Sequence, residues 1–235
     1  MATVRGNLER VRERIATACD RAARPPEAVR LVGVTKSVDP GRARELVMAG
    51  CGDLAESRPQ QLWARAASLA DLGDSVRWHL VGHLQRNKVQ RTLPVCHLIH
   101  SLDSARLLDS LWREARSANH IARVLVEVDL TGSAARTGLP PEEVEPLLAG
   151  WPADGSVVAC GLMGMASAPE PGVPAGRARR QFAALRELRD RLRPLVPGLT
   201  ELSMGMSDDF EDAILEGATI VRIGSALWEG LGPAA

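Results

Sequence analysis

The chain contains no tyrosine, and only two of its 29 basic residues, Lys36 and Lys88, are lysine. Without tyrosine, no phenolic hydroxyl can act as an acid or a base in this protein. Arginine cannot form an imine because its guanidinium group stays protonated, whereas a lysine amine can be desolvated and become a nucleophile. The sequence therefore limits any nucleophilic amine side chain to Lys36 or Lys88.

The chain also lacks an excess of charge, a long apolar run and closely paired cysteines. Its 29 basic and 29 acidic residues balance, which argues against binding to nucleic acid or to an anionic membrane. No stretch approaches the ~18 apolar residues of a membrane span, and residues 1–20 carry charges every few positions, unlike a signal peptide. The four cysteines form no CxxC pair, so we expect reduced thiols in a cytoplasmic protein without a structural zinc site.

Short apolar runs alternate with amphipathic segments along the whole chain. An N-terminal helix is predicted over 5–22, and eight strands are predicted at 31–36, 51–57, 76–82, 97–102, 123–130, 157–165, 200–205 and 219–227. Helices are predicted between them at 41–49, 60–70, 84–91, 104–117, 141–149, 175–193 and 208–216. Eight strand–helix units in one chain of this length favour a closed barrel. We therefore predict a single (β/α)8 TIM-type barrel domain over 1–235 with an extra N-terminal helix; a doubly wound open sheet is the alternative.

Several candidate site residues lie where such a barrel carries its active site, at the C-terminal ends of the strands. Lys36 is the last residue of the first predicted strand. The loops after the seventh and eighth strands, which frequently bind phosphate in these barrels, contain Ser207, Gly224 and Ser225. We predict Ser207 to be a helix N-cap. An ordinary surface lysine and an N-cap serine without a ligand are the alternatives.

Arg222 lies two residues before Gly224, so both are on the same side of the eighth predicted strand. A buried arginine inside a barrel requires a partner. An acceptor nitrogen on a ligand ring would serve, and so would a core carboxylate such as Glu56 or Glu127. Taken alone, Arg222 favours the carboxylate interpretation.

His79 and His83 have a spacing that metal-binding histidines use. The HExxH type of zinc site needs both histidines on one helical face and a glutamate after the first. Gly82 lies at a predicted strand-to-helix turn, and no glutamate follows His79. We therefore interpret the two histidines as site-lining or structural residues and predict no metal site.

Taken together, these segments resemble the YggS/PROSC family of proteins that bind pyridoxal 5′-phosphate (PLP) and act in PLP homeostasis. The fold of that family is like the N-terminal barrel of alanine racemase. The matching segments follow one another along nearly the whole chain: LVGVTK (31–36), WHLVGHLQRNK (78–88), IHSLDS (99–104), VLVEVDLTG…TGL (124–139), GLMGM (161–165) and LSMGMSDDFEDAILEGATIVRIGSALWEG (202–230). The last segment is long enough to be highly specific.

The resemblance implies a role for each candidate residue. PLP is expected to form a Schiff base with Lys36, and Arg222 is expected to face the ring nitrogen. Ser207, Gly224 and Ser225 are expected to contact the phosphate. Ser225 stands where the family usually has threonine, and it keeps the hydroxyl group.

One segment, LAESRPQQ (54–61), departs from the family pattern, which runs close to GEN-x-x-QE. The asparagine of that pattern lies near the cofactor, and its position here is Ser57. We expect the shorter hydroxyl of Ser57 to contact the ring oxygen directly or through water.

An arginine at the ring nitrogen disfavours protonation of the ring, which makes the cofactor a weaker electron sink. Alanine racemase-like enzymes also use a tyrosine from a second, β-rich domain, and this chain has no tyrosine and no room for that domain. The resemblance thus implies a non-catalytic PLP-binding protein of intracellular PLP homeostasis, with PLP-dependent apo-enzymes as candidate partners. The alternative is a PLP-dependent amino-acid racemase that uses His79, His83 or Cys160 as its base. A PLP-free Schiff-base aldolase on the same barrel is a third, weaker interpretation.

Overall fold

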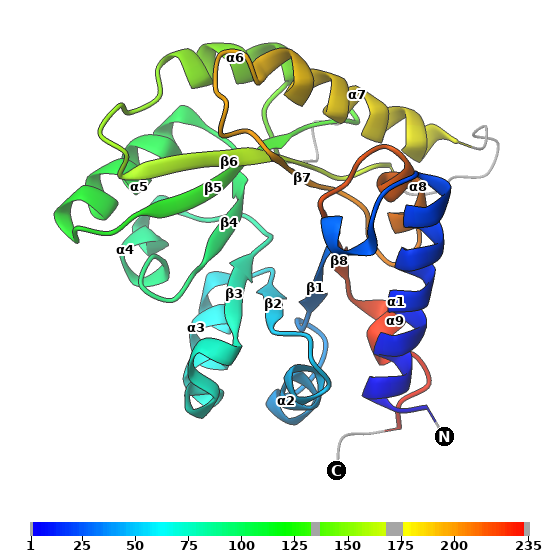
Figure 1. The fold of residues 1–235 in the computed structure, drawn as a ribbon. Coiled ribbons are helices and arrows are strands. Elements are labelled where there is room, and N and C mark those ends of the chain that lie inside the picture. The colour runs from blue at the N-terminus through cyan, green and yellow to red at the C-terminus, as the bar shows by residue number, and fades with distance from the viewer. Residues whose placement is uncertain (1, 133–136, 168–175, 233–235) are drawn as a thin grey trace.

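The computed structural model describes residues 2–132, 137–167 and 176–232, and within them eight parallel strands close into a barrel (Figure 1). The strands follow one another round the barrel in chain order, and the first pairs with the last. They are β1 (Arg30–Val34), β2 (Asp53–Glu56), β3 (Arg77–Leu80), β4 (Leu98–Leu102), β5 (Ala122–Val128), β6 (Val157–Gly164), β7 (Glu201–Ser203) and β8 (Ile220–Ile223). The closed order confirms the predicted TIM-type barrel and excludes the doubly wound open sheet.

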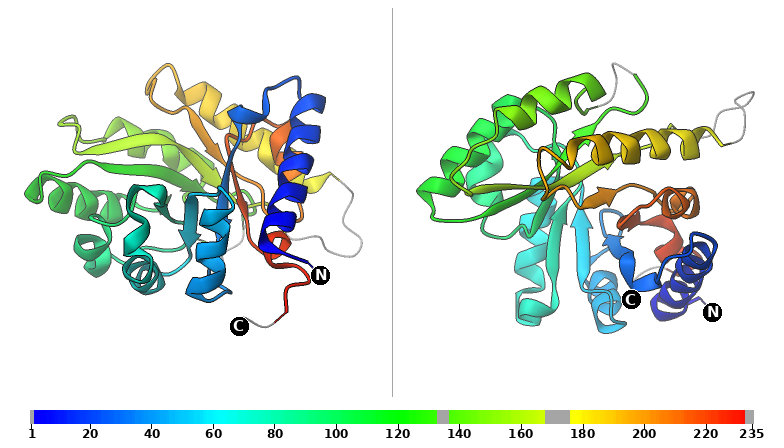
Figure 2. Two further views of the ribbon diagram at one scale, coloured as in Figure 1. Left: turned by 60° about the horizontal axis from the view of Figure 1, so that its bottom comes forward. Right: turned by 45° about the horizontal axis from the view of Figure 1, so that its top comes forward.

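Helices surround the strands on the outside of the barrel (Figure 2). They are α1 (Val4–Arg21), α2 (Pro40–Met48), α3 (Pro59–Ser68), α4 (Val89–Thr92), α5 (Ala105–Ser117), α6 (Pro141–Ala149), α7 (Arg177–Leu192), α8 (Phe210–Leu215) and α9 (Ser225–Trp228). Short 3-10 turns occur at η1 (Pro26–Ala28), η2 (Ala70–Ser75) and η3 (Arg86–Lys88). None of the described helices combines the length and the apolar character needed to cross a bilayer.

The predicted N-terminal helix is confirmed as α1. Thr3 caps it by accepting a hydrogen bond from the Gly6 amide at 3.1 Å. Its apolar side is buried, and the helix packs against α2, α8 and α9 (Figure 1). The buried Asn7 side chain donates to the carbonyl oxygens of Leu227 and Glu229, both at 2.9 Å. These two bonds join α1 to the end of α9, so α1 braces the last strand–helix unit of the barrel.

Side chains of one parity on the strands fill the barrel interior. One apolar cluster consists of Val32, Val34, Ala55, Leu98, Leu125, Met163 and Ile220. Because successive side chains on a strand point to opposite faces, the residues two positions away from these also face inward. They include the buried polar residues Asp53, His100 and Arg222. His79 is also buried, two positions before Val81, which packs against the same cluster. The interior is therefore packed, and part of its packing is polar.

The eighth predicted strand, 219–227, is wrong in its second half. β8 ends at Ile223, and residues from Ser225 form the short helix α9. The backbone leaves the strand at Gly224, which has φ −118° and ψ −86°. The indole nitrogen of Trp228 then donates to the carbonyl oxygen of Val34 at 3.0 Å. This bond folds the end of the apolar run back onto β1, which local periodicity alone does not indicate.

The predicted helix 84–91 is also largely replaced. The chain forms η3 and then the single turn of α4. Pro94 follows two residues after α4 ends, and proline has no N–H group with which to continue the helical hydrogen-bond ladder.

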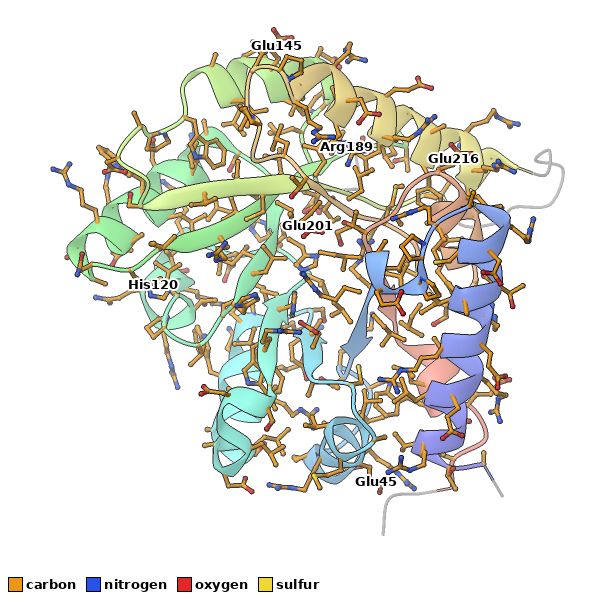
Figure 3. The ribbon with its side chains drawn as sticks, viewed as in Figure 1. Glu45, His120, Glu145, Arg189, Glu201 and Glu216 are labelled. Atoms are coloured by element: carbon orange, nitrogen blue, oxygen red, sulfur yellow. The ribbon has the colours of Figure 1, made fainter. Side chains whose placement is uncertain are left out.

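The arginine-rich segment predicted as the helix 175–193 forms α7, with residue 175 outside the described residues. Its buried face consists of Phe182, Leu185, Leu188 and Leu192. Arg179 and Arg186 both reach the carboxylate of Glu216, at 2.7 and 3.4 Å. Figure 3 shows Glu216 beneath this helix. These ion pairs attach the outer helix to the end of α8.

Candidate functional site

Lys36 lies in an exposed turn two residues beyond β1, so its predicted place within the strand is wrong. The strand next to β1 is nevertheless β8, which carries the candidate residue Arg222. β1 pairs with β8, with Val32 opposite Arg222. A methyl group added at Gly224 would lie 3.6 Å from the Cβ atom of Val34. The end of β1 that carries Lys36 is therefore beside the end of β8.

A partly buried arginine that the sequence did not indicate, Arg65, holds the turn of Lys36. The Nη2 atom of Arg65, on α3, donates to the carbonyl oxygens of Thr35 at 3.2 Å and Val38 at 2.5 Å. Its Nε atom donates to Glu56 at 3.2 Å, and the Thr35 hydroxyl donates to the same carboxylate oxygen at 2.7 Å. Glu56, at the end of β2, was the signal that could have indicated such a cation. Glu56 is fully buried, and a buried carboxylate requires a cation or several hydrogen-bond donors.

Arg222 is buried inside the barrel, with 4% of its surface exposed. Its Nη1 atom donates to the Ser203 hydroxyl at 2.6 Å and its Nη2 atom to the carbonyl oxygen of Gly164 at 3.1 Å. Within the described residues, no salt bridge joins it to a carboxylate. Glu56 is bound by Arg65 instead, and Glu127 accepts a hydrogen bond from Thr137. The carboxylate interpretation of Arg222 is therefore wrong.

The charge of Arg222 is present at neutral pH without a direct counter-ion. Burial lowers the pKa of Arg222 to about 10, and the more distant carboxylates of Asp209 and Glu127 oppose this shift. Burial also raises the pKa of Asp209 and of Glu127. A buried cation with fixed neutral acceptors and no contacting anion is suited to a ligand that brings an acceptor atom or negative charge.

Ser207 is not the helix N-cap that we predicted, because Asp209 occupies that position for α8. The Ser207 hydroxyl oxygen instead accepts from the amides of Gly224 and Ala226, each at 3.3 Å. The loop reaches β8 through a sharp turn at Gly205, where φ is +91° and an added Cβ atom would lie 2.8 Å from the backbone of Phe210. Two backbone N–H groups at the start of α9 thus converge on one oxygen atom.

Ser225 lies in the first turn of α9, with an exposed side chain. Its hydroxyl, the Ser207 hydroxyl and the converging amides of Gly224 and Ala226 come from the loops after β7 and β8. Neutral N–H and O–H donors of this kind suit the oxygen atoms of a phosphate group. The two loops lie together in the structure; their contact with phosphate stays a prediction.

Ser57 directly follows β2 and is half-buried. Among the described residues, its hydroxyl has no hydrogen-bond partner. A Cβ atom at Gly82 would lie 2.2 Å from the Ser57 carbonyl oxygen. Only glycine therefore lets the loops after β2 and β3 approach this closely. All the candidate residues come from four strands that are consecutive round the barrel, β7, β8, β1 and β2, or from the loops that follow them. These residues are Lys36, Ser57, Ser207, Arg222, Gly224 and Ser225.

The two histidines at metal-like spacing do not share a site. His79 is buried in the barrel interior, where its ring nitrogens contact Asp53 and His100, each at 2.9 Å. His83 is half-exposed, and its Nδ1 atom contacts Asp103 at 2.7 Å. The described residues contain no group of three or more metal-ligating side chains. All four cysteines are free thiols.

The side chains at this rim fit the three reactive parts of PLP. An exposed amine on Lys36 suits an aldehyde, and the donors at Ser207, Gly224 and Ser225 suit a phosphate. Arg222 presents a cation that can only donate hydrogen bonds, which suits an unprotonated pyridine nitrogen. The buried charge of Arg222 without a contacting carboxylate is the structural observation on which this fit depends.

Comparison with known proteins places the chain in a family. Residues 6–231 match the family described as "Alanine racemase, N-terminal domain". A pyridoxal phosphate homeostasis protein of Aquifex aeolicus is 40% identical over 225 residues, which are 94% of this chain and 95% of that protein. A pyridoxal phosphate homeostasis protein of Pseudomonas aeruginosa is 36% identical and covers 97% of this chain and 96% of its own length.

Solved structures agree with these matches. PipY of Synechococcus elongatus, with PLP bound, has a TM-score of 0.78 at 35% identity and covers 92% of this chain and 99% of its own. An alanine racemase of Clostridium difficile has a TM-score of 0.76 at 18% identity, and the match spans 57% of that enzyme. The second likeness concerns the fold alone. The chain therefore belongs to the family of pyridoxal phosphate homeostasis proteins, which share the barrel of the alanine racemase N-terminal domain.

Proposed function

We propose that this protein binds PLP as a Schiff base on Lys36, in the cytoplasm, and controls the supply of PLP to PLP-dependent apo-enzymes without turning over amino acids itself. The observation that carries the proposal is the buried, unneutralised Arg222 on the strand beside the one that leads to Lys36. The relatives from Aquifex and Pseudomonas are named for PLP homeostasis, and the PipY structure contains PLP.

Each candidate residue has a separate task in this proposal. Lys36 supplies the amine, and Arg65 holds the backbone on either side of it. Ser207, Gly224 and Ser225 bind the phosphate, and the Ser57 hydroxyl faces the ring oxygen. When bound, PLP supplies an aldehyde for amines and a ring that accepts negative charge. Arg222 donates a hydrogen bond toward the ring nitrogen and itself stays protonated at neutral pH. The ring nitrogen therefore stays unprotonated, and the ring stays a weak electron sink.

The placement of the three candidate bases favours this function over a racemase. Both ring nitrogens of His79 are engaged by neighbouring side chains inside the barrel. The Cys160 thiol donates to the carbonyl oxygen of Val158 at 3.6 Å, and burial raises its pKa. A thiol with a raised pKa is a poor base at neutral pH. His83, on the surface beside Asp103, is the remaining candidate.

A titration of the purified protein with PLP tests the proposal. We expect saturable binding with imine absorbance, much weaker binding of pyridoxal, and recovery of activity when the loaded protein is mixed with a PLP-dependent apo-enzyme. A protein that shows no imine absorbance at saturating PLP does not have the proposed function. A protein that binds PLP but transfers it to no apo-enzyme would contradict the supply role and leave the PLP-binding role intact.

Amino-acid turnover tests the racemase alternative. We incubate the PLP-loaded protein with a panel of L-amino acids in deuterated water and follow loss of the α-proton by NMR. The expected exchange is far slower than an ordinary enzymatic rate of about 1 s⁻¹, because both ring nitrogens of His79 are engaged and burial raises the pKa of the Cys160 thiol, which leaves His83 as the remaining candidate base. Exchange at about 1 s⁻¹ or faster that is abolished by His83→Ala would make the protein an enzyme and would identify its base.

A further inference from the structure

A chain of hydrogen bonds crosses the barrel interior and ends on Arg222. Its links are short: Arg222 to the Ser203 hydroxyl at 2.6 Å, Ser203 to His100 Nδ1 at 2.8 Å, and His100 Nε2 to His79 Nδ1 at 2.9 Å. The last link joins His79 Nε2 to Asp53 at 2.9 Å. These residues come from β8, β7, β4, β3 and β2. We call Ser203, His100, His79 and Asp53 the interior relay.

Burial makes the relay a fixed structure. Ser203, His100 and His79 are fully buried, and Asp53 is 7% exposed. At its outer end, Asp53 accepts hydrogen bonds from Arg77 at 2.6 and 2.9 Å. Arg77 is at the first, exposed position of β3. The relay therefore runs from the N-terminal end of the barrel, where strands begin, to the arginine beneath the candidate cofactor site.

The chemistry of the two ends sets the direction of every bond in the relay. Burial would raise the pKa of Asp53, but hydrogen bonds from His79 and Arg77 outweigh it and hold that pKa below its ordinary value. Asp53 is therefore an ionised acceptor. Arg222, at the other end, can only donate. Burial also lowers the pKa of His79 and His100, so both rings are neutral and each has one donor and one acceptor.

Only one proton arrangement satisfies these conditions. His79 must donate from Nε2 to Asp53, so its Nδ1 atom accepts from His100 Nε2. The Nδ1 atom of His100 then accepts from the Ser203 hydroxyl. Ser203 uses its single proton on His100, which leaves its oxygen to accept from Arg222. Ser203 is the one side-chain partner of Arg222 among the described residues, since the other bond goes to the backbone of Gly164.

We propose that Ser203, His100 and His79 are positioning residues which, anchored on Asp53, fix the guanidinium plane of Arg222 toward the cofactor ring. The proposal rests on the proposed function, in which Arg222 faces that ring. Two acceptors, the oriented Ser203 hydroxyl and the Gly164 carbonyl, hold the two terminal nitrogens and so set the plane. These two hydrogen bonds, and not an ion pair, direct the remaining N–H groups of Arg222 toward the ring.

The first test measures the relay itself and needs no cofactor. In the ¹⁵N NMR spectrum of the apo-protein, we expect His79 and His100 to be neutral Nε2–H tautomers with slowly exchanging Nε2 protons. An Nδ1–H tautomer or a charged ring at His100 at neutral pH would overturn the proposal. This result is independent of PLP binding, so it separates failure of the relay from failure of the proposed function.

The second test measures the effect on the cofactor with a matched pair of variants. Ser203→Thr keeps the hydroxyl, and Ser203→Val has nearly the same shape without it. We expect the dissociation constant for PLP to rise about tenfold in S203V, with a shifted absorbance maximum, and to stay within about threefold of wild type in S203T. Glu201→Gln, two residues earlier on β7 and outside the relay, is the control (Figure 3).

Equal affinities and spectra in S203T and S203V would overturn the proposal. If neither variant folds, the wild-type NMR signals decide it. On addition of PLP, the Nδ1 resonance of His100 should shift, because its donor Ser203 also contacts Arg222. The resonance of His120, which Figure 3 shows at the outer edge of the molecule, should not shift. A His100 resonance that stays unchanged on saturation with PLP would contradict coupling between the relay and the cofactor.

Discussion

At the scale of single residues, the sequence indicated candidate residues through their chemistry or their side of a strand. It missed residues whose contacts come from distant parts of the sequence. The interior position of Arg222 was predictable because its parity with Gly224 places it inside a barrel. Lys36 is a candidate because only two lysines are present, and its role stays a prediction. The prediction of Ser207 as a helix N-cap was wrong, since its hydroxyl contacts amides 17 and 19 residues away. No local pattern indicates His100, whose neighbours come from β3 and β7.

The buried histidines predict a specific dependence of stability on pH. Burial lowers the pKa of His79, against the opposing effect of Asp53, and lowers that of His100 well below its ordinary value. The unfolded chain takes up protons at these positions below about pH 6.5, and the folded protein does not. The free energy of unfolding therefore falls as the pH drops below about 6.5. His100 contributes about 1 kcal/mol of this loss between about pH 6.5 and 5.5, and His79 adds to it in the same direction.

Urea unfolding of wild type and His100→Gln at about pH 6.5 and 5.5 measures this contribution. The variant should lose about 1 kcal/mol less than wild type over the interval, because it lacks one titrating ring. Glu127 and Asp209, whose raised pKa values act in the opposite direction, cancel in the comparison. Identical losses in the two proteins would show that His100 is protonated in the folded state or titrates there as it does in the unfolded chain.

At the scale of helices, strands and loops, the apolar runs predicted where elements exist, and tertiary contacts decided where they end. β1 stops before Lys36, and the turn that follows is held by Arg65 from another unit. The eighth run divides into β8 and α9, and Trp228 at the end of α9 bonds back to Val34 on β1. Both departures lie at the C-terminal rim, so the strand ends that sequence analysis placed least well are those that form the candidate site.

Arg65 should affect both stability and cofactor binding. Arg65→Met leaves Glu56 buried without its cation, and breaking such a pair costs about 3–5 kcal/mol. It also removes both bonds to the backbone around Lys36. The double variant Arg65→Met with Glu56→Gln should recover most of the stability in urea unfolding but still bind PLP about tenfold more weakly.

Arg44→Met, which removes an exposed pair with Asp71, is the control for Arg65 and should change neither property appreciably. A double variant that binds PLP as tightly as wild type would mean that Arg65 supports the fold and not the turn of Lys36.

The loops after β7 and β8 should contribute the phosphate affinity. Replacing Ser207 and Ser225 together by alanine removes two hydroxyl donors and should weaken PLP binding by about 1–3 kcal/mol, the cost of lost hydrogen bonds to a charged group. Fluorescence titration measures the change. Ser110→Ala, on the outer face of α5, removes a hydroxyl bonded within its own helix and should have no effect. Wild-type protein that binds pyridoxal and PLP equally well would contradict this phosphate site.

At the scale of the whole molecule, the fold was predictable because eight strand–helix units follow one another without interruption, and that alternation closes a barrel. Closure brings the ends of β1 and β8, almost 190 residues apart in the sequence, side by side. The same closure creates an interior that no single segment encodes. The polar residues there come from strands spread over the whole chain, so the interior relay could be read only from the folded structure.

Covalent trapping of the cofactor tests the central claim most directly. Wild-type protein is loaded with PLP, reduced with borohydride, digested and mapped by mass spectrometry. We expect one pyridoxyl adduct, on Lys36, and a folded Lys36→Ala variant that shows neither the imine absorbance nor the adduct. A unique adduct on Lys88 in wild type, or an unchanged yield of a single adduct in Lys36→Ala, would contradict the assignment of Lys36.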